Sequence, residues 1–266
     1  MTVFDEIMAR FGQLSVPARA NEPMSAHTTF RIGGPARVFC TPNSQAQLAQ
    51  AIAACHELGL RYYLLGRGSN VLFADEGYEG VVIQVGSKLG EIQVDGPRVT
   101  AGAGALLAHV CLAAAEAGLA GLEFAYGIPG CVGGGVYMNA GAYGGEMKDV
   151  LESATFFDEQ LREVTLSASD LHLGYRTSAF ELMPWCILRA SFLLTPGDSE
   201  EIRARMRDFA QRRVDKQPLD MPSAGSTFKR PKGAYAGALI DKCGLRGYAV
   251  GGAAISEKHC GFVVNK

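Results

Sequence analysis

Glycine is unusually dense in the middle of the chain, where residues 118–145 contain ten glycines in 28 positions. Glycine at this density loses much conformational entropy on folding and therefore disfavours a plain helix or strand. It suits a backbone that passes close to a flat or charged ligand, because amide N–H groups are then offered without side chains in the way. The segment has no Gly-X-Y period and is too apolar for a flexible linker. We therefore expect a ligand-cradling loop.

Length and composition are those of an ordinary globular protein. The chain has 266 residues, enough for one large domain or two smaller ones, with 48% hydrophobic and 20% charged residues. A net charge of −2 and the lack of a basic tract give no indication of a nucleic-acid partner. No signal-peptide pattern and no apolar stretch of membrane-spanning length are visible. We expect a cytoplasmic protein without a membrane partner, of undetermined oligomeric state.

Cysteine and histidine spacing argues against a metal site. The seven cysteines are scattered, odd in number and never in a Cys-x-x-Cys pair, and the five histidines lie far apart. This pattern fits buried thiols in a reducing compartment rather than disulfides or zinc ligands.

Helix-like and strand-like patches alternate along the chain, which indicates a mixed α and β fold. Ser44 caps one expected helix, and Asp198 with Glu201 forms a capping box for another. The turn-prone stretch 216–223 breaks that second helix and begins a second domain. Helices are expected at 44–58, 106–117, 198–213 and 235–243, and strands at 62–66, 81–85, 153–157, 163–166 and 262–265, with a hairpin at 91–100 that turns at Asp95-Gly96.

A second glycine cluster, Leu65-Gly-Arg-Gly-Ser-Asn-Val71, follows an apolar strand. Such a loop can present several N–H donors to a diphosphate, with Arg67 nearby. It lacks the Lys-Ser/Thr of a Walker A loop and the third glycine of a Rossmann fingerprint, so a plain tight turn is an equal alternative. A third cluster, Thr28-Thr-Phe-Arg-Ile-Gly-Gly-Pro-Ala36, completes the set. Together the three clusters indicate an extended ligand, such as a dinucleotide, across a cleft.

Two further segments carry candidate catalytic side chains. Tyr175-Arg176 puts a permanent planar cation beside a phenol, and arginine suits a carboxylate or a developing enolate. A surface arginine in a loop is the alternative for this pair taken alone. Ser226 lies in Ser223-Ala-Gly-Ser-Thr-Phe-Lys-Arg-Pro231, without a Gly-x-Ser-x-Gly motif or a histidine close in sequence. A proton donor and a turn cap both remain possible roles for this serine.

In this order, these segments resemble the UDP-N-acetylenolpyruvoylglucosamine reductases (UDP-N-acetylmuramate dehydrogenases), flavoenzymes of bacterial peptidoglycan synthesis. The resemblance runs from about Thr28 to the last residue and is to the compact type, without an extra substrate-covering loop. It implies an α+β fold with an FAD-binding domain of the PCMH (vanillyl-alcohol oxidase) type at 1–200, in subdomains of about 1–88 and 89–200. A smaller α/β substrate domain at 201–266 follows. The motifs that carry the resemblance are Arg31-Ile-Gly-Gly-Pro35, Gly66-Arg-Gly-Ser-Asn70, Gly127-Ile-Pro-Gly130, Met138-Asn-Ala-Gly-Ala-Tyr-Gly144, Gly174-Tyr-Arg176, Ser223-Ala-Gly-Ser226 and Gly251-Gly with Ser256-Glu-Lys-His259.

The resemblance also implies cofactors and residue roles. FAD is expected to be bound non-covalently, because Asn70 occupies the region where covalent relatives carry a histidine, and NADPH is the implied reductant. Arg176 would stabilise the enolate, and Ser226 would protonate the carbanion. The implied cofactor-binding residues are Gly66, Arg67, Gly68, Ser69, Asn70, Gly127, Ile128, Pro129, Gly130, Gly133, Gly134, Asn139, Gly141 and Ala142. The implied substrate-binding residues are Tyr175, Lys229 and Lys242.

One departure from the family concerns the end of the sequence. Members of the family continue past the Phe-Val-Val-Asn strand with a helix and a strand whose glutamate completes the active site, whereas this sequence stops at Lys266. We therefore expect a truncated substrate domain; a variant with another acid is an alternative. The alternative functions are an FAD- or nucleotide-sugar-binding protein without catalysis, and a flavin oxidase of the same superfamily.

Overall fold

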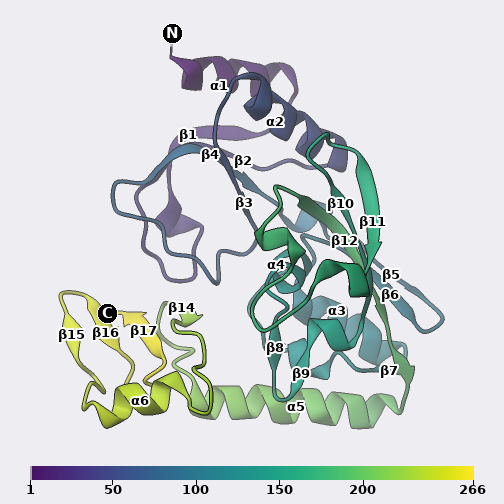
Figure 1. The fold of residues 1–266 in the computed structure, drawn as a ribbon, viewed down its shortest axis with the longest axis vertical. Helices are drawn as coiled ribbons and strands as arrows, with labels where there is room; N and C mark the ends of the chain where they lie inside the picture. Colours follow the sequence, from purple (N-terminus) through teal and green to yellow (C-terminus); the bar gives the residue numbers. More distant parts are fainter. Residues whose placement is uncertain (1) are drawn as a thin grey trace.

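The computed structural model describes residues 2–266. The first subdomain is a four-stranded sheet in the order β1-β2-β4-β3, with helices α1 and α2 beside it (Figure 1). The side chain of Ser44 caps α2 by accepting the N–H of Gln47, and the helix ends before Gly59, whose φ is 61°. Both ends of this helix confirm the prediction. The elements are α1 (Val3–Gln13), β1 (Ala18–Pro23), η1 (Met24–Ala26), β2 (Pro35–Cys40), α2 (Gln45–Glu57), β3 (Tyr62–Leu65) and β4 (Tyr78–Gln84).

The second subdomain is an antiparallel five-stranded sheet in the order β11-β10-β12-β6-β5. The predicted hairpin at 91–100 is present, and Gly96 has the positive φ (53°) that the turn between β5 and β6 requires. The strands predicted at 153–157 and 163–166 are also present and pair antiparallel. The regular elements are η2 (Ser87–Leu89), β5 (Ile92–Asp95), β6 (Arg98–Gly102), α3 (Leu107–Glu116), α4 (Val132–Tyr137), β10 (Leu151–Phe157), β11 (Glu163–Ser167) and β12 (Cys186–Leu193). Short pieces complete it: β7 (Leu119–Ala120), η3 (Glu123–Ala125), β8 (Gly141–Ala142), β9 (Gly145–Glu146), η4 (Met147–Asp149), η5 (Ala168–Leu171), η6 (Ala179–Glu181) and β13 (Thr195–Pro196).

A single apolar core joins the two subdomains. It contains Phe11 and Ile52 from the first subdomain together with Phe156 and Phe192 from the second. Because this core is continuous, the relative position of the two sheets is fixed, and so are the loops that leave them.

The long helix α5 (Ser199–Lys216) connects the second sheet to the C-terminal part (Figure 1). Its N-terminus is capped by Asp198, which accepts the N–H of Glu201 at 2.9 Å as predicted, and it runs past Arg213 to Lys216. Ile202 and Met206 of α5 are buried in the core of the two subdomains. The predicted domain boundary between residues 200 and 201 stays a proposal. Although most of α5 follows this boundary in the sequence, the helix packs against the part of the chain that precedes it.

The C-terminal part is a small sheet in the order β14-β17-β16-β15, with helix α6 beside it. The predicted short helix and final strand are both present, and Gly244 after α6 has a φ of 71°. The elements are β14 (Ser223–Ser226), α6 (Ala236–Lys242), β15 (Ala249–Val250), β16 (Ala253–Ile255) and β17 (Phe262–Asn265).

The glycine-rich segment corrects one expectation, because part of it is helical. Helix α4 contains three consecutive glycines, Gly133 to Gly135. A Cβ at Gly133 would lie 3.0 Å from the Cβ of Ala103, and one at Gly135 would lie 3.2 Å from Cε of Met147. Glycine is therefore used here for close packing of a short helix, a gain that offsets its low helix propensity.

The cysteines bring a second correction. All seven thiols are free, and six are buried as expected, but Cys243 is exposed. Burial raises the pKa of the Cys55, Cys111 and Cys186 thiols to about 12. Within residues 2–266 we find no cluster of side chains that would hold a metal ion, and no helix with the length and apolarity needed to cross a membrane.

Candidate active site

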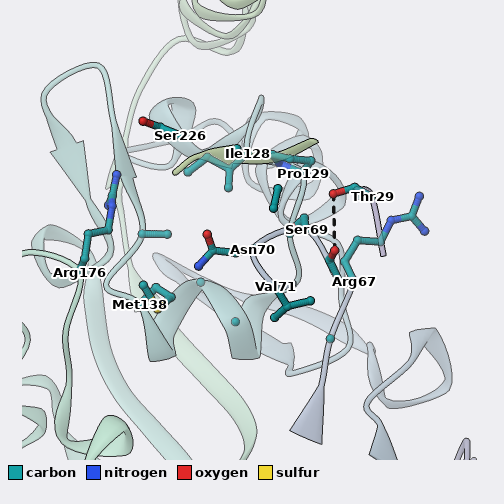
Figure 2. Close-up of a pocket in the computed structure, with 18 of the residues that line it drawn as sticks. Thr29, Arg67, Ser69, Asn70, Val71, Ile128, Pro129, Met138, Arg176 and Ser226 are labelled. Carbon is teal, nitrogen blue, oxygen red and sulfur yellow. Dashed lines mark hydrogen bonds between the residues drawn. The ribbon is translucent and has the colours of Figure 1, made fainter. Parts of the chain in front are cut away.

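A large open cleft, with a volume of about 2070 Å³, lies between the two subdomains and the C-terminal sheet. The loop after β3, the glycine-rich segment, the Tyr175–Arg176 turn and strand β14 all contribute to its walls (Figure 2). Pockets for small ligands usually measure about 300–1,000 Å³. The cleft therefore has room for an extended cofactor together with a second ligand.

The loop after β3 forms one wall and offers unpaired N–H groups. Gly68 has a φ of 69°, and a Cβ there would lie 2.0 Å from the carbonyl oxygen of His27, so only glycine fits. Within the described residues, none of the backbone N–H groups of residues 67–71 donates a hydrogen bond to the protein. A run of free N–H donors that lines a cleft is suited to a diphosphate.

The segment from Gly127 to Gly134 forms the adjoining part of the wall. Ile128 and Pro129 line the cleft, and a Cβ at Gly130 would lie 3.8 Å from Oγ of Ser69 (Figure 2). A Cβ at Gly66 would lie only 2.4 Å from Sγ of Cys131, so the two glycine loops approach each other closely. The free donors and the glycine walls fit a cofactor that combines a diphosphate with a planar ring, as FAD does. Of the predicted cofactor-binding residues, those that line the cleft are Gly66, Arg67, Gly68, Ser69, Asn70, Gly127, Ile128, Pro129, Gly130, Gly133, Gly134, Gly141 and Ala142.

Asn139 is the exception, because it is fully buried and is not part of the cleft lining. Its Nδ2 donates to Oε2 of Glu146 at 2.8 Å and to the carbonyl of Gly174 at 2.9 Å. Its Oδ1 accepts the N–H of Lys148 at 2.9 Å. The side chain thus holds the turn that carries Arg176 and has no free group for a cofactor.

Arg176 lies on a tight turn closed by the bridge between Gly174 and Thr177. Its backbone is left-handed, with a φ of 56°. Nη2 donates to the carbonyl oxygen of Gly141 at 2.9 Å, and Cζ lies 5.4 Å from the centre of the Tyr175 ring. Nη1 also donates to the carbonyl oxygen of Asn139 at 3.4 Å, and together these contacts hold the cation at the cleft.

Ser226 ends strand β14 and faces the same cleft (Figure 2). It pairs with Phe262 of β17, and the next residue, Thr227, donates its N–H to the carbonyl of Gly261 at 2.8 Å. The serine hydroxyl is therefore presented by a paired strand end rather than by a mobile loop. Figure 2 shows Arg176 and Ser226 toward the same side of the view, with Asn70 and Met138 nearby, and all four residues line the cleft.

Comparison with known proteins bears on this arrangement. Residues 36–167 match the family described as "FAD binding domain", and residues 217–266 match "UDP-N-acetylenolpyruvoylglucosamine reductase, C-terminal domain". The UDP-N-acetylenolpyruvoylglucosamine reductase of Clostridium beijerinckii is 49% identical over 242 residues, which are 91% of this chain and 79% of that relative. This chain belongs to the UDP-N-acetylenolpyruvoylglucosamine reductase family. A reductase of the same name from Caldanaerobacter subterraneus is 47% identical over 92% of this chain and 81% of its own length.

Solved structures confirm the predicted α+β fold of the PCMH type. The UDP-N-acetylenolpyruvylglucosamine reductase (MurB) of Thermus caldophilus has a TM-score of 0.80 and 37% identity, covering 94% of this chain and 88% of that one. The cholesterol oxidase of B. sterolicum matches with a TM-score of 0.56 and 16% identity, over 69% of this chain and 38% of the oxidase. At that identity the likeness concerns the fold alone. The family match and these structures support FAD as the cofactor of the reductase fold.

Two of the three predicted substrate-binding residues lie at the cleft, and the third does not. Tyr175 and Lys229 line the cleft, and the Tyr175 hydroxyl accepts the N–H of Arg230 at 3.1 Å. Lys242 lies at the end of α6, is exposed, and is not among the residues that line the cleft. The structure therefore brings Tyr175 and Lys229 to the site and leaves Lys242 outside it.

Sequence reasoning missed a histidine beside Ser226. A Cβ at Gly261 would lie 3.0 Å from Oγ of Ser226 and 2.8 Å from Cε1 of His259, so hydroxyl and ring flank one glycine. Nδ1 of His259 accepts the N–H of Gly261 at 3.0 Å. Ser226 ends strand β14, whereas His259 lies in the loop between β16 and β17. The sequence offered one signal, the Ser256-Glu-Lys-His259 motif, but we assigned no role to its histidine.

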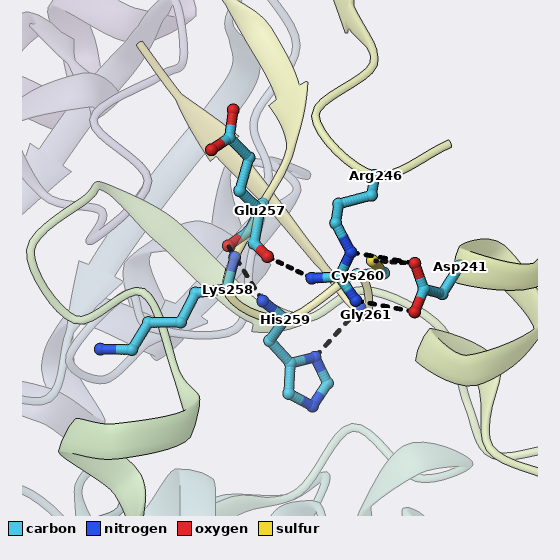
Figure 3. A network of polar contacts seen from close by, with 8 residues as sticks. Asp241, Arg246, Glu257, Lys258, His259, Cys260 and Gly261 are labelled. Carbon is cyan, nitrogen blue, oxygen red and sulfur yellow. Dashed lines mark hydrogen bonds and ion pairs between the residues drawn. The ribbon is translucent and has the colours of Figure 1, made fainter. Parts of the chain in front are cut away.

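The loop that carries His259 is held by a polar network (Figure 3). Arg246 binds Asp241 through two contacts, of 2.9 Å from Nε and 2.7 Å from Nη2, and its Nη1 donates to the carbonyl of Glu257. The buried hydroxyl of Ser256 accepts the N–H groups of Lys258 and His259 at 3.2 and 3.3 Å. This network ties the loop to α6 and so fixes the side of the cleft where Ser226 lies.

Proposed function

We propose that this chain reduces the enolpyruvyl group of UDP-N-acetylenolpyruvoylglucosamine to give UDP-N-acetylmuramate, with NADPH as reductant and non-covalent FAD as cofactor. The reaction belongs to the synthesis of peptidoglycan precursors. The observation that carries the proposal is the position of Arg176 and Ser226 in one cleft whose walls are glycine loops (Figure 2). Seven unpaired thiols support a cytoplasmic site of action.

The glycine loops have a binding role in this proposal. FAD, when bound, supplies hydride transfer between NADPH and the double bond of the substrate. The free N–H groups of residues 67–71 hold its diphosphate, and the bare backbone around Gly66 and Gly130 leaves room for flat rings. Asn70 offers an amide, which does not form the covalent flavin bond that a histidine can form.

Arg176 stabilises the charge that develops during reduction. Hydride addition to the enolpyruvyl group places negative charge on the carbon beside the substrate carboxylate, and this charge spreads into the carboxylate as an enolate. A cation fixed in advance lowers the barrier because it needs no reorganisation during the reaction. The hydrogen bond to the Gly141 carbonyl provides that fixed position.

Ser226 completes the reaction by donating a proton to this carbon. A hydroxyl is a weak acid at neutral pH, but a carbanion is a strong enough base to take its proton. The pairing of β14 with β17 holds the hydroxyl at the cleft. Tyr175 and Lys229 are the proposed contacts for the carboxylate or diphosphate of the substrate.

The decisive experiment follows the flavin absorbance of the purified chain. The flavin is reduced anaerobically with NADPH, and UDP-N-acetylenolpyruvoylglucosamine is then added. We expect rapid reoxidation. A flavin that stays reduced would identify a binding protein without this activity, and reoxidation only by oxygen would identify an oxidase. A folded but colourless protein that takes up no FAD would refute the cofactor assignment.

A further inference from the structure

The guanidinium of Arg213, near the end of α5, has two buried nitrogen atoms without a hydrogen-bond partner and no carboxylate partner in the part of the chain that the structure describes. Its Nε and Nη1 atoms are the only buried side-chain nitrogen or oxygen atoms among residues 2–266 that make no hydrogen bond. Two other arginines of the same helix have carboxylate partners: Arg205 binds Glu123 and Arg212 binds Asp208, both at 2.7 Å. Arg213 differs from the other arginines of the helix in that its unpaired nitrogen atoms are buried.

A buried cation without a counter-charge destabilises the folded chain, because it has lost water and gained nothing in return. Burial accordingly lowers the pKa of the Arg213 guanidinium below its usual value, although the neighbouring Tyr143 hydroxyl acts in the opposite direction. Unsatisfied buried groups are rare in native proteins, and a missing ligand or ion is a common reason for one.

The surroundings of Arg213 indicate the kind of ligand. Arg213 lines the cleft, and a Cβ at Gly127 would lie 3.3 Å from its Cδ and 3.4 Å from its Nη1. Gly127 and residues 67–71, whose N–H groups make no hydrogen bond to the described residues, line this same cleft. The unpaired cation and the unpaired donors thus line the same cleft, and both require an anion.

We propose that Arg213 binds a phosphate group of a diphosphate held in this cleft. A guanidinium is a planar fork that matches two phosphate oxygens, and the charge makes each hydrogen bond stronger. The inference rests on the proposed function, which brings two diphosphates to the cleft, that of FAD and that of the nucleotide sugar. The chemistry of recognition is the same for both, so the test has one arm for each.

The test compares Arg213→Met with Arg213→Lys and with the control Arg212→Met on the exposed side of the same helix. Loss of a charged hydrogen bond to phosphate weakens binding by roughly 10- to 100-fold, and we expect this for Arg213→Met. Arg213→Lys keeps the charge and loses the fork, so its loss is smaller. The melting temperature of the flavin-free Arg213→Met protein stays the same or rises, because an unpaired buried charge has been removed.

The first arm measures the release of FAD from the diluted holoprotein by the return of flavin fluorescence. The second arm titrates the FAD-loaded protein with UDP in a calorimeter. Weaker FAD binding with unchanged UDP binding assigns Arg213 to the cofactor, and the reverse result assigns it to the nucleotide sugar. Neither arm depends on turnover, so an inactive protein would refute the proposed function without deciding this inference.

Three results would overturn the inference. The first is unchanged affinity for both FAD and UDP in Arg213→Met. The second is a flavin-free Arg213→Met protein that melts at a lower temperature or does not fold, which would show that the arginine supports the fold itself. The third is an equal loss of affinity in Arg212→Met, which would show a general effect of charge on α5.

Discussion

The Oγ1 atom of Thr29 donates a hydrogen bond of 2.7 Å to the carbonyl oxygen of Ser223, which lies 194 residues further along the chain. The backbone N–H of Thr29 donates to the carbonyl of Gly68 at 2.9 Å. Beside it, Nδ2 of Asn265 donates to the carbonyl of Phe30 at 3.2 Å. Residues 29 and 30 therefore connect the proposed diphosphate loop to the strand that presents Ser226.

We predict that Thr29→Val slows the reoxidation of reduced flavin by the enolpyruvyl substrate about fivefold, the equivalent of about 1 kcal/mol for one lost hydrogen bond. Valine matches threonine in shape and keeps the backbone N–H, so NADPH should reduce the flavin at the normal rate. Stopped-flow absorbance separates the two half-reactions. Thr29→Ser, which keeps the hydroxyl, is the control; equal slowing in both variants would show that loss of this hydrogen bond does not explain the effect.

Ser226→Ala should retain flavin reduction by NADPH and lose roughly 10²- to 10⁴-fold in the second half-reaction, the range for removal of a general acid. The reason is that hydride transfer to the substrate must be accompanied by protonation of the carbanion. Rapid mixing of the pre-reduced variant with substrate measures this step directly. Unchanged reoxidation would remove Ser226 from the mechanism.

Arg176→Ala should also spare flavin reduction, and it should slow the second half-reaction by roughly 10²- to 10³-fold, as expected for loss of one fixed stabilising group. Arg176→Lys keeps the charge but not the planar fork that donates to Gly141, so an intermediate rate is expected. The same stopped-flow assay ranks the three proteins. If both half-reactions fall equally, the arginine supports the site as a whole rather than the enolate.

Local signals in the sequence predicted the regular elements well. Ser44 and Gly59 fixed both ends of α2, and Asp95-Gly96 fixed a hairpin, because capping and positive φ act over a few residues. The helix with three consecutive glycines was not predicted. Glycine is needed there because Ala103 and Met147, which lie outside the helix, approach its backbone closely. Tertiary packing overrode the local preference of glycine.

The candidate site was predictable only where a motif lay within one segment. The loops around Gly66 and Gly127 were found in this way. The contact of Asn139 with Gly174, and the place of His259 beside Ser226, depend on how segments far apart in the sequence come together. The burial of the Arg213 nitrogen atoms could not be predicted from the sequence either, since arginine is ordinarily exposed.

The ion pair between Asp241 and Arg246 gives a prediction about pH (Figure 3). The hydrogen bond from Arg246 holds the pKa of Asp241 below its ordinary value of 3.8. A carboxyl whose pKa is lowered by folding binds protons less readily in the folded chain than in the unfolded chain. Its contribution to stability is therefore complete at neutral pH and is lost as the pH falls through the folded-state pKa.

We expect Asp241→Asn to lower the urea midpoint of unfolding at pH 7 by a small amount, since both side chains are about half exposed. The difference from the unchanged protein should shrink as the pH falls below about 4 and vanish once Asp241 is protonated in the folded chain. Glu257→Gln is the matched control, because its carboxylate forms no ion pair within residues 2–266. A difference that stays constant as the pH is lowered through the titration of Asp241, or one that grows on acidification, would show that Asp241 acts through its shape and not through its charge.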